Sequence, residues 1–387
     1  MNFESFLPYY TFEVPAKMRA RFDTFTEEKA CLPMVSEEEF RAVEQATKVD
    51  PDCFRVLREL NAKLFENKAN NAAARFLRHG LFEACPPWDN GVWQQQLLTV
   101  EGFPQETVDL LIVTAALGYT LTVRKPPADL NEENVGAYRG YIKAFTDHHD
   151  YWGIDNPTWN RLCAGGCMFL FHTLKFQPEQ FSNDFLVLTD GEHYVTLLKG
   201  NFCVSDEQIL VEPELPHAVE SVYEEREDGW YAHEIAATGR VSLTPALFPK
   251  EFWRVALCEK DAVLGFHIPS KVPYTPEDHK ESMRQALEFY RAYFPDMEFK
   301  AFVCYSWLYS LQNADLLPAG SRILEMQKCG HLCPMLARFP ADTIFVRKGS
   351  ELHKRAIDYY ASGKIWRTGF MYSPLSEAEH FGEWRHN

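Results

Sequence analysis

Residues that could hold an anion stand where an apolar strand, residues 263–268, gives way to an amphipathic helix. Thr275 has the side chain of a helix N-cap, and Pro276 suits the first helical position because no amide hydrogen is needed there. Asp278 completes a variant of the capping box. Free amides and the helix dipole favour a phosphate at such a helix start, so the sequence offers an anion site at this joint.

Charges around this joint argue in both directions. Lys271, Lys280 and Arg284 could neutralise a phosphate from the loop and from the first turns of the helix. Glu277 and Asp278, however, already place negative charge at the helix start, and the loop has no glycine that would let a ligand approach the backbone. A well-capped connection that binds nothing is therefore the alternative interpretation.

Two clusters contain residue types that bind metals. The first, residues 147–150 (Asp-His-His-Asp), falls near a helix end, where adjacent histidines point about 100 degrees apart and cannot easily share one ion. A solvated helix end and the wall of a pocket at the domain junction are its other interpretations. The second, residues 329–333 (Cys-Gly-His-Leu-Cys), lacks a second ligand pair at zinc-like spacing. No metal site is expected.

Length and charge limit the class of protein. With 387 residues the chain exceeds what one hydrophobic core usually serves, so two domains are expected. Hydrophobic residues make up 46% of the chain, which is ample for packed interiors. The formal net charge is -16 and basic runs are missing, which argues against a nucleic-acid partner.

Targeting and redox signals favour the cytoplasm. The first residues, MNFESFLPYYTFEV, have neither a basic segment nor a long apolar segment, so no signal peptide is expected. The uncharged run 110–123 is shorter than the roughly 18 residues of a membrane span, which indicates a buried helix and no membrane partner. The ten cysteines are read as reduced thiols.

The first part of the chain carries mainly helical signals. Ser36 followed by Glu39 has the form of a capping box, which predicts a helix start. Apolar residues at spacings of three and four predict a helix over residues 52–67. A further helical segment is expected from residue 131 to about 149, after a Pro-Pro break. This part of the chain should therefore be a helical domain.

The pattern changes to short strands after Trp159. Residues 185–188 and 193–198 flank an Asp-Gly turn and predict a hairpin. Strand 263–268, helix 276–293 and strand 299–308 then form a strand, helix, strand unit. Such a crossover makes the two strands parallel in one sheet, with the helix start beside the strand tops.

Several segments resemble a known family. FHIP at residues 266–269, the helix start that follows it, and FVCYSWLYS at 302–310 look like the GNAT-like C-terminal domain of a bacterial two-domain N-acyltransferase family. Residues 146–177 are similar to that family's junction between a helical N-terminal domain and the first strands, and the resemblance extends to 344–370.

The resemblance implies an α+β protein and an activity. A mainly helical N-terminal domain, 1–166, would precede a GNAT-like mixed α/β domain with a central mixed sheet, 167–387. The implied reaction moves an acyl group from a coenzyme A thioester to an amine, so the expected partners are acyl-CoA and an amine acceptor. A catalytically degenerate GNAT-fold protein that binds a ligand or a partner is the alternative.

In GNAT-type proteins two parallel strands splay apart and hold the pantetheine, and the pyrophosphate meets the next helix. The resemblance carries these roles onto a strand at 264–268, a loop at 269–274 and a second splayed strand at 302–308. The implied coenzyme-binding residues are Leu264, Phe266, Ile268, Ser270, Lys271, Val272 and Lys280.

Amine acylation needs a base, an oxyanion stabiliser and an acid for the leaving thiolate. His267 is the candidate base, and Ser306 or a nearby tyrosine, Tyr305 or Tyr309, is the candidate acid. A bonded strand histidine and packed core aromatics are the structural alternatives. Cys304 has no evident partner that would make it a nucleophile.

Two features of the sequence depart from the family pattern. Glycines are common in the family's loop, whereas this loop has none, and Tyr305 stands where the family often has a histidine. Both departures bear on the function. The loop is where coenzyme binding could fail, and a histidine that took part in proton transfer would be missing here.

Overall fold

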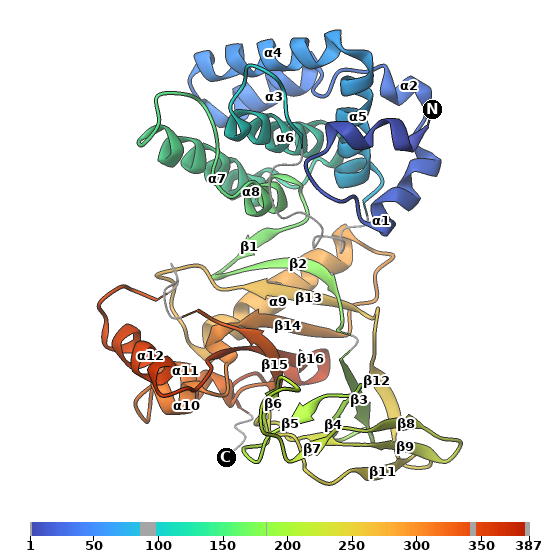
Figure 1. The fold of residues 1–387 in the computed structure, drawn as a ribbon, viewed down its shortest axis with the longest axis vertical. Coiled ribbons are helices and arrows are strands. Elements are labelled where there is room, and N and C mark those ends of the chain that lie inside the picture. The colour runs from blue at the N-terminus through green and yellow to red at the C-terminus, as the bar shows by residue number, and fades with distance from the viewer. Residues whose placement is uncertain (1, 86–97, 183, 341–345, 384–387) are drawn as a thin grey trace. The chain divides into compact units, whose positions relative to one another are not determined.

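A computed structural model describes residues 2–85, 98–182, 184–340 and 346–383 (Figure 1). The chain forms two compact units, Met1–Leu170 and Phe171–Asn387. The domain boundary at 166/167 stays a prediction. Residues 344 and 345, with which the last family-like segment begins, lie outside the described residues.

The first unit consists of helices, as the sequence predicts. They are η1 Phe3–Ser5, η2 Leu7–Tyr9, α1 Ala16–Arg19, η3 Ala20–Thr24, α2 Glu27–Ala30, α3 Glu37–Thr47, α4 Pro51–Glu66, α5 Lys68–Arg78, η4 His79–Glu83, α6 Gln105–Tyr119, η5 Thr120–Arg124, α7 Ala128–Thr146 and α8 Pro157–Ala164. The helix predicted to start at the Ser36 cap is α3, which begins at Glu37 as expected. The predicted helices 52–67 and 131 to about 149 correspond to α4 and α7, with ends shifted by a few residues.

Local chemistry explains where these helices begin. The Ser36 hydroxyl accepts a hydrogen bond from the Glu39 amide while the Glu39 carboxylate accepts one from the Ser36 amide, so the capping box is confirmed. Helix α4 begins after Asp50, whose side chain accepts from the Asp52 amide, with Pro51 at its first position. Amphipathic stripes on these helices then bury one continuous core.

Helix α6 is the core helix of this unit. Together with η5 it spans Gln105–Arg124, which is long and apolar enough for a membrane span by length and composition. However, 72% of its most apolar window is buried inside the protein, as is typical of the central helix of a packed domain. The prediction of a buried helix over residues 110–123 is therefore confirmed up to the end of α6.

The second unit is built on a six-stranded sheet in the order β1-β2-β13-β14-β16-β15. Its strands are β1 Phe169–Phe171, β2 Leu174–Gln180, β13 Ala262–His267, β14 Ala301–Ser306, β15 His331–Arg338 and β16 Arg367–Pro374. Strand β13 pairs with β14 in parallel and with β2 antiparallel, so the sheet is mixed. The predicted α+β class with a central mixed sheet is confirmed.

Smaller sheets form from the strands between β2 and β13. Their orders are β10-β4-β3-β12, β11-β9-β8 and β6-β5-β7, from β3 Phe185–Thr189, β4 Tyr194–Leu198, β5 Cys203–Val204, β6 Leu210–Val211, β7 Val219–Glu220, β8 Tyr223–Glu225, β9 Gly229–Ala232, β10 Glu234–Ile235, β11 Ala246–Pro249 and β12 Arg254–Leu257. The predicted hairpin is confirmed, since β3 and β4 pair antiparallel around the Asp-Gly turn.

Helix α9 Pro276–Tyr293 lies across one face of the large sheet (Figure 1). Met283, Ala286 and Tyr290 are buried there, and the Tyr290 hydroxyl donates a hydrogen bond to the carbonyl of Phe176 in β2. The strand, helix, strand unit predicted from the sequence is confirmed. The remaining helices of this unit are η6 Trp307–Tyr309, α10 Asn313–Leu316, α11 Arg322–Gln327, α12 Glu351–Ala361 and α13 Leu375–Ala378.

The second predicted strand, 299–308, is too long at both ends. Strand β14 covers Ala301–Ser306, and a 3-10 turn, η6, begins at Trp307. The Ser306 hydroxyl accepts a hydrogen bond from the Leu308 amide and so caps this turn. A polar side chain in an aromatic run therefore ends the strand, which the run's β propensity alone did not indicate.

Candidate active site

The parallel strands β13 and β14 share only part of their length. Their paired positions run from Val263 and Ala301 to Gly265 and Val303. Beyond Gly265 each strand keeps only its outer neighbour: β13 pairs with β2 as far as His267, and β14 pairs with β16 as far as Ser306. The two strands therefore no longer pair with each other at their carboxyl ends.

Alternation along the strands sets which side chains meet at this separation. The registers place Gln177 and Glu179 of β2, Gly265 and His267 of β13, and Tyr305 of β14 on one face of the sheet. Two of the predicted catalytic residues, His267 and Tyr305, thus share a face. Sequence reasoning missed Glu179, which lies on the same face.

Glu179 occupies the space that a side chain at position 265 would need. A Cβ atom on Gly265 would collide with the Glu179 carboxylate. The Gln177 side-chain amide donates a hydrogen bond to this carboxylate across 2.7 Å. Burial raises the pKa of Glu179 to about 7, and the Gln177 bond only partly opposes this. A glycine inside an otherwise apolar strand was the sequence signal of such a close approach.

His267 is the last residue of β13, opposite Lys175 of β2. Burial, and to a smaller extent the positive charge of Lys175, together lower its pKa to about 4. The imidazole is therefore neutral at physiological pH. Its low pKa makes it a weak proton acceptor, which bears on its predicted role as the base.

Tyr305 and Ser306 end up on opposite faces of β14 because they are neighbours in a strand. The Tyr305 ring stacks on Phe370 with ring centres 4.4 Å apart, and 44% of the residue is exposed. Partial burial raises the pKa of its hydroxyl, which thus keeps its proton at neutral pH. Ser306 caps η6 on the other side.

Cys304 lies on the same side of β14 as Ser306 and is buried. Burial raises the pKa of its thiol well above the usual value, so the reactive thiolate is disfavoured. Tyr309, the other tyrosine considered as an acid, is also fully buried, and its pKa is raised for the same reason. Neither residue has the exposure that direct chemistry on a soluble substrate requires.

The loop between β13 and α9 adopts a conformation normally associated with glycine. Lys271 has φ of +67°, in the left-handed region. A tight turn that other loops make with glycine is thus made here with lysine, and the exposed Lys271 ammonium stands at its tip. Ser270 is exposed beside it, while Val272 is half-buried.

The start of helix α9 is capped as the sequence predicts. The Thr275 hydroxyl accepts a hydrogen bond from the Asp278 amide at 3.2 Å and donates one to the Asp278 carboxylate at 2.6 Å. The Nε2 atom of His172, in the turn before β2, lies 2.8 Å from the same carboxylate. Asp278 therefore already supplies negative charge at the helix start, and this reduces how strongly the helix dipole can stabilise a ligand phosphate there.

Residues near the C-terminus pack on this helix start. The Lys280 ammonium lies 2.8 Å from the carboxylate of Glu383, and the His279 ring stacks on Phe381. A Cβ atom at Gly382 would collide with Pro276. The predicted phosphate ligand Lys280 is thus paired with a carboxylate, and Arg284 likewise pairs with Glu281 at 2.8 Å.

The two clusters considered as metal sites have other roles. Asp147 pairs with Lys143 at 2.8 Å, and the His149 ring stacks on Phe145. In the second cluster, His331 pairs with Glu377 at 2.8 Å. Among the described residues, neither set brings three ligand atoms together.

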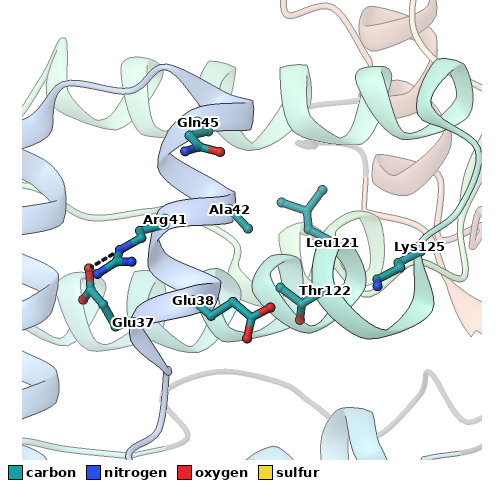
Figure 2. Close-up of a pocket in the computed structure, with 8 residues that line it drawn as sticks. All are labelled: Glu37, Glu38, Arg41, Ala42, Gln45, Leu121, Thr122 and Lys125. Atoms are coloured by element: carbon teal, nitrogen blue, oxygen red, sulfur yellow. Dashed lines mark hydrogen bonds and ion pairs between the residues drawn. The ribbon is translucent and has the colours of Figure 1, made fainter.

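A shallow hollow of about 440 Å³ opens on the helical unit (Figure 2). It lies between α3 and η5, with Glu37, Glu38 and Arg41 on one side and Lys125 on the other. Arg41 and Glu37 form an exposed ion pair at 3.4 Å. None of the predicted site residues lines it, and its charged, mixed walls do not suit a thioester.

Comparison with known proteins identifies the class of domain that this geometry defines. The model of the GNAT-like C-terminal domain family matches residues 172–369, just over half of the chain. The chain belongs to this family, which confirms the resemblance seen in the sequence. No curated protein sequence matches the chain significantly.

Two solved structures are similar to nearly the whole chain. One is an acyltransferase in complex with CoA and 10C-teicoplanin, 14% identical, with 89% of this chain and 90% of that one covered and a TM-score of 0.50. The other is a mutant acyltransferase in complex with octanoyl-CoA, 12% identical, with 93% and 100% covered and a TM-score of 0.52. At such low identity the likeness establishes the fold.

Proposed function

We propose that the chain is an acyl-CoA-dependent acyltransferase. The observation that carries this proposal is the separation of β13 and β14 after Gly265, within a domain of the GNAT-like family. Structures of this fold have been obtained with CoA and with octanoyl-CoA, which supports a thioester as the acyl donor. No metal is needed for this reaction.

The pantetheine would lie along the open edge of β13, at Phe266 and at Ile268 just after the strand; Leu264, the third predicted residue, still pairs with Phe302 of β14. Main-chain groups on this edge lack a β14 partner beyond Gly265 and can pair with the pantetheine amides. The phosphates would then reach the loop, where Ser270 and Lys271 are exposed. Lys280 becomes available if it exchanges the Glu383 carboxylate for a phosphate, because exposed ion pairs are weak.

The acceptor is proposed to be an amine. Its nitrogen attacks the thioester carbon, the C–N bond forms, the C–S bond breaks, and CoA leaves as a thiolate. The nitrogen loses one proton to a base, and the thiolate gains one from an acid. Backbone amides at the separated strand ends would stabilise the oxyanion of the tetrahedral intermediate.

Glu179 fits the role of base better than His267. A general base works best when its pKa lies near the working pH. The pKa of Glu179 is raised to about 7, while that of His267 is lowered to about 4. We assign the nitrogen's proton to the Glu179 carboxylate and leave His267 as a neutral group further along the same face of the sheet. Tyr305, a protonated phenol on the same face, is the proton donor to the thiolate.

A ligand-binding protein that has lost catalysis is the second candidate. The observations that favour it are the glycine-free loop and the Lys280–Glu383 pair, which together weaken the phosphate site. Incubation of the protein with octanoyl-CoA and a panel of primary amines separates the two. Acylated amine detected by mass spectrometry, and lost in Glu179→Gln, supports the enzyme. Binding of octanoyl-CoA without any product supports the second candidate.

A further inference from the structure

We propose that Cys203, His217 and Glu220 form a zinc site that stabilises the β5-β6-β7 sheet. The cysteine sulfur, an imidazole nitrogen and a carboxylate oxygen of these residues lie within 4.8 Å of one another. Thiolate, imidazole and carboxylate are all groups that bind zinc in proteins, and a water molecule would complete the tetrahedron, as it does in zinc sites with three protein ligands. The site is separate from the proposed acyl transfer.

Two of the ligands are held by strand pairing. Cys203 in β5 and Glu220 in β7 are directly opposite each other in an antiparallel pair. Directly opposed side chains on one sheet face approach to about 5 Å, which is close to the spacing of two ligands on one ion. Cys203 is buried while Glu220 is exposed, so the carboxylate can swing toward the sulfur at small cost.

The residues beside these ligands fix the backbone. The buried Ser221 hydroxyl donates to the Gly200 carbonyl at 2.7 Å and accepts from the Phe202 amide at 2.9 Å. The Ala218 amide donates to the Val204 carbonyl at 2.8 Å. Residues on each side of the proposed ligands are therefore locked together, and this gives the site its preorganisation.

The hydrogen bond of His217 selects the tautomer that binds a metal. Its Nδ1 atom lies 3.0 Å from the Leu215 carbonyl oxygen. A carbonyl only accepts, so Nδ1 carries the hydrogen and the neutral ring keeps a lone pair on Nε2. Nε2 faces Glu220 across 4.0 Å. A backbone carbonyl that orients the ring in this way is the usual outer partner of a zinc-bound histidine.

The fold gives such an ion a structural task. Strands β5, β6 and β7 have two residues each, far fewer than an independent strand usually has. An ion that joins β5, β7 and the turn before β7 would stabilise this small sheet, because the free energy of metal binding adds to the stability of the folded state.

Cobalt(II) titration of the full chain tests the site. Wild-type protein should bind one Co²⁺ and show a thiolate-to-cobalt charge-transfer band together with the visible bands of tetrahedral cobalt. Zn²⁺ should displace the Co²⁺, so that all these bands disappear. Cys203→Ser should lose the charge-transfer band. His217→Gln, an exposed change that leaves the core intact, should weaken Co²⁺ binding at least about tenfold.

The control variants are Cys258→Ser, a half-buried thiol elsewhere in the unit, and His193→Gln, an exposed histidine paired with Asp190. Both should keep the bands. Zn²⁺ should also raise the melting temperature of wild type and of these controls, and it should not raise that of His217→Gln. Wild type without a charge-transfer band, or a band that His217→Gln leaves unchanged, would overturn the proposal.

Discussion

The carboxylate of Glu179 lies directly against Gly265, at the last position where β13 still pairs with β14. The strands separate from this point on, so the Glu179 carboxylate lies where the gap between β13 and β14 begins. Its polar partner in the described structure is the Gln177 side chain, at 2.7 Å, and no cation offsets its burial. These two residues, which are distant in the sequence, define the proposed reaction centre.

Glu179→Gln should lower kcat by a factor of about 10²–10⁴, the usual contribution of a general base. In wild type the carboxylate must be ionised, so kcat/KM should rise with pH through a pKa of about 7. That limb should vanish in the variant, while the Kd for octanoyl-CoA changes little. A limb that persists in Glu179→Gln would assign the proton to another group.

Gly265→Ala should push the Glu179 carboxylate out of place and leave the backbone where it is. The atoms in collision belong to the end of a side chain that can rotate away. We expect activity to fall at least about tenfold, with a loss of unfolding free energy below about 1.5 kcal/mol. The matched test is the double variant with Glu179→Gln, in which Gly265→Ala should have almost no further effect on kcat. Additive losses would mean that the two residues act independently.

Lys271→Gly separates the charge of the loop from its shape. Glycine accepts the φ of +67° more readily than lysine, so stability should rise by up to about 1 kcal/mol while the turn is kept. The Kd for CoA should increase up to about fivefold, because an exposed charge contact is worth at most about 1 kcal/mol. Calorimetric titrations with CoA and dephospho-CoA measure the affinity, and denaturant unfolding measures the stability, with Lys260→Gly as control at another left-handed lysine. Unchanged CoA affinity would remove Lys271 from the phosphate site.

Glu383→Gln should release Lys280 for a ligand phosphate. The two charges lie 2.8 Å apart, and the carboxylate competes with any anion at the start of α9. We expect the Kd for CoA to fall about twofold to fivefold, with more effect at low ionic strength. Glu379→Gln, an exposed neighbour, is the control. Weaker binding in Glu383→Gln would show that the pair helps to build the site.

Arg78→Met in the helical unit should destabilise the protein by about 3–5 kcal/mol, since it leaves the Glu39 carboxylate buried without its cation. The pair is bidentate, at 2.9 and 2.5 Å, and both side chains are only 6% exposed. The double change with Glu39→Met should restore much of this loss. Denaturant unfolding curves of wild type, of Arg78→Met and of the double variant check the order of stabilities.

The same pair should make the protein sensitive to acid. Burial alone would raise the pKa of Glu39, but the bonds from Arg78 and Ser36 outweigh it and leave the pKa below its usual value. The pair therefore stabilises the fold above the pKa of the unfolded chain, about 4.3, and this stability is lost as pH falls further. In the double variant, which lacks the pair, the free energy of unfolding should fall less steeply than in wild type as the pH is lowered from about 5 to about 3, the range around that unfolded-state pKa.

Local patterns were the predictable part of this molecule. The cap at Thr275, the capping box at Ser36 and the hairpin around Asp190-Gly191 follow from a few neighbouring residues, and each is present. The parallel unit of β13, α9 and β14 followed from the order of elements. Such features need no knowledge of what packs against them.

The contacts that shape the candidate site are not local. Glu179 meets Gly265 across two strands, and Lys280 meets Glu383 across 103 positions of sequence. The choice of His267 as base rested on residue type, and only its burial beside Lys175 showed how low its pKa is. Lys271 in a left-handed conformation was likewise invisible, because propensity predicts glycine there.

Hydrogen exchange with mass spectrometry on the wild-type chain, with and without saturating octanoyl-CoA, tests whether the thioester binds between β13 and β14. If the thioester lies between the separated strands, exchange should slow in peptides that cover residues 265–271 and 303–306, whereas the β3-β4 hairpin should be unaffected. Exchange that stays unchanged at both strand ends, with the ligand at saturation or without detectable binding, would contradict the account.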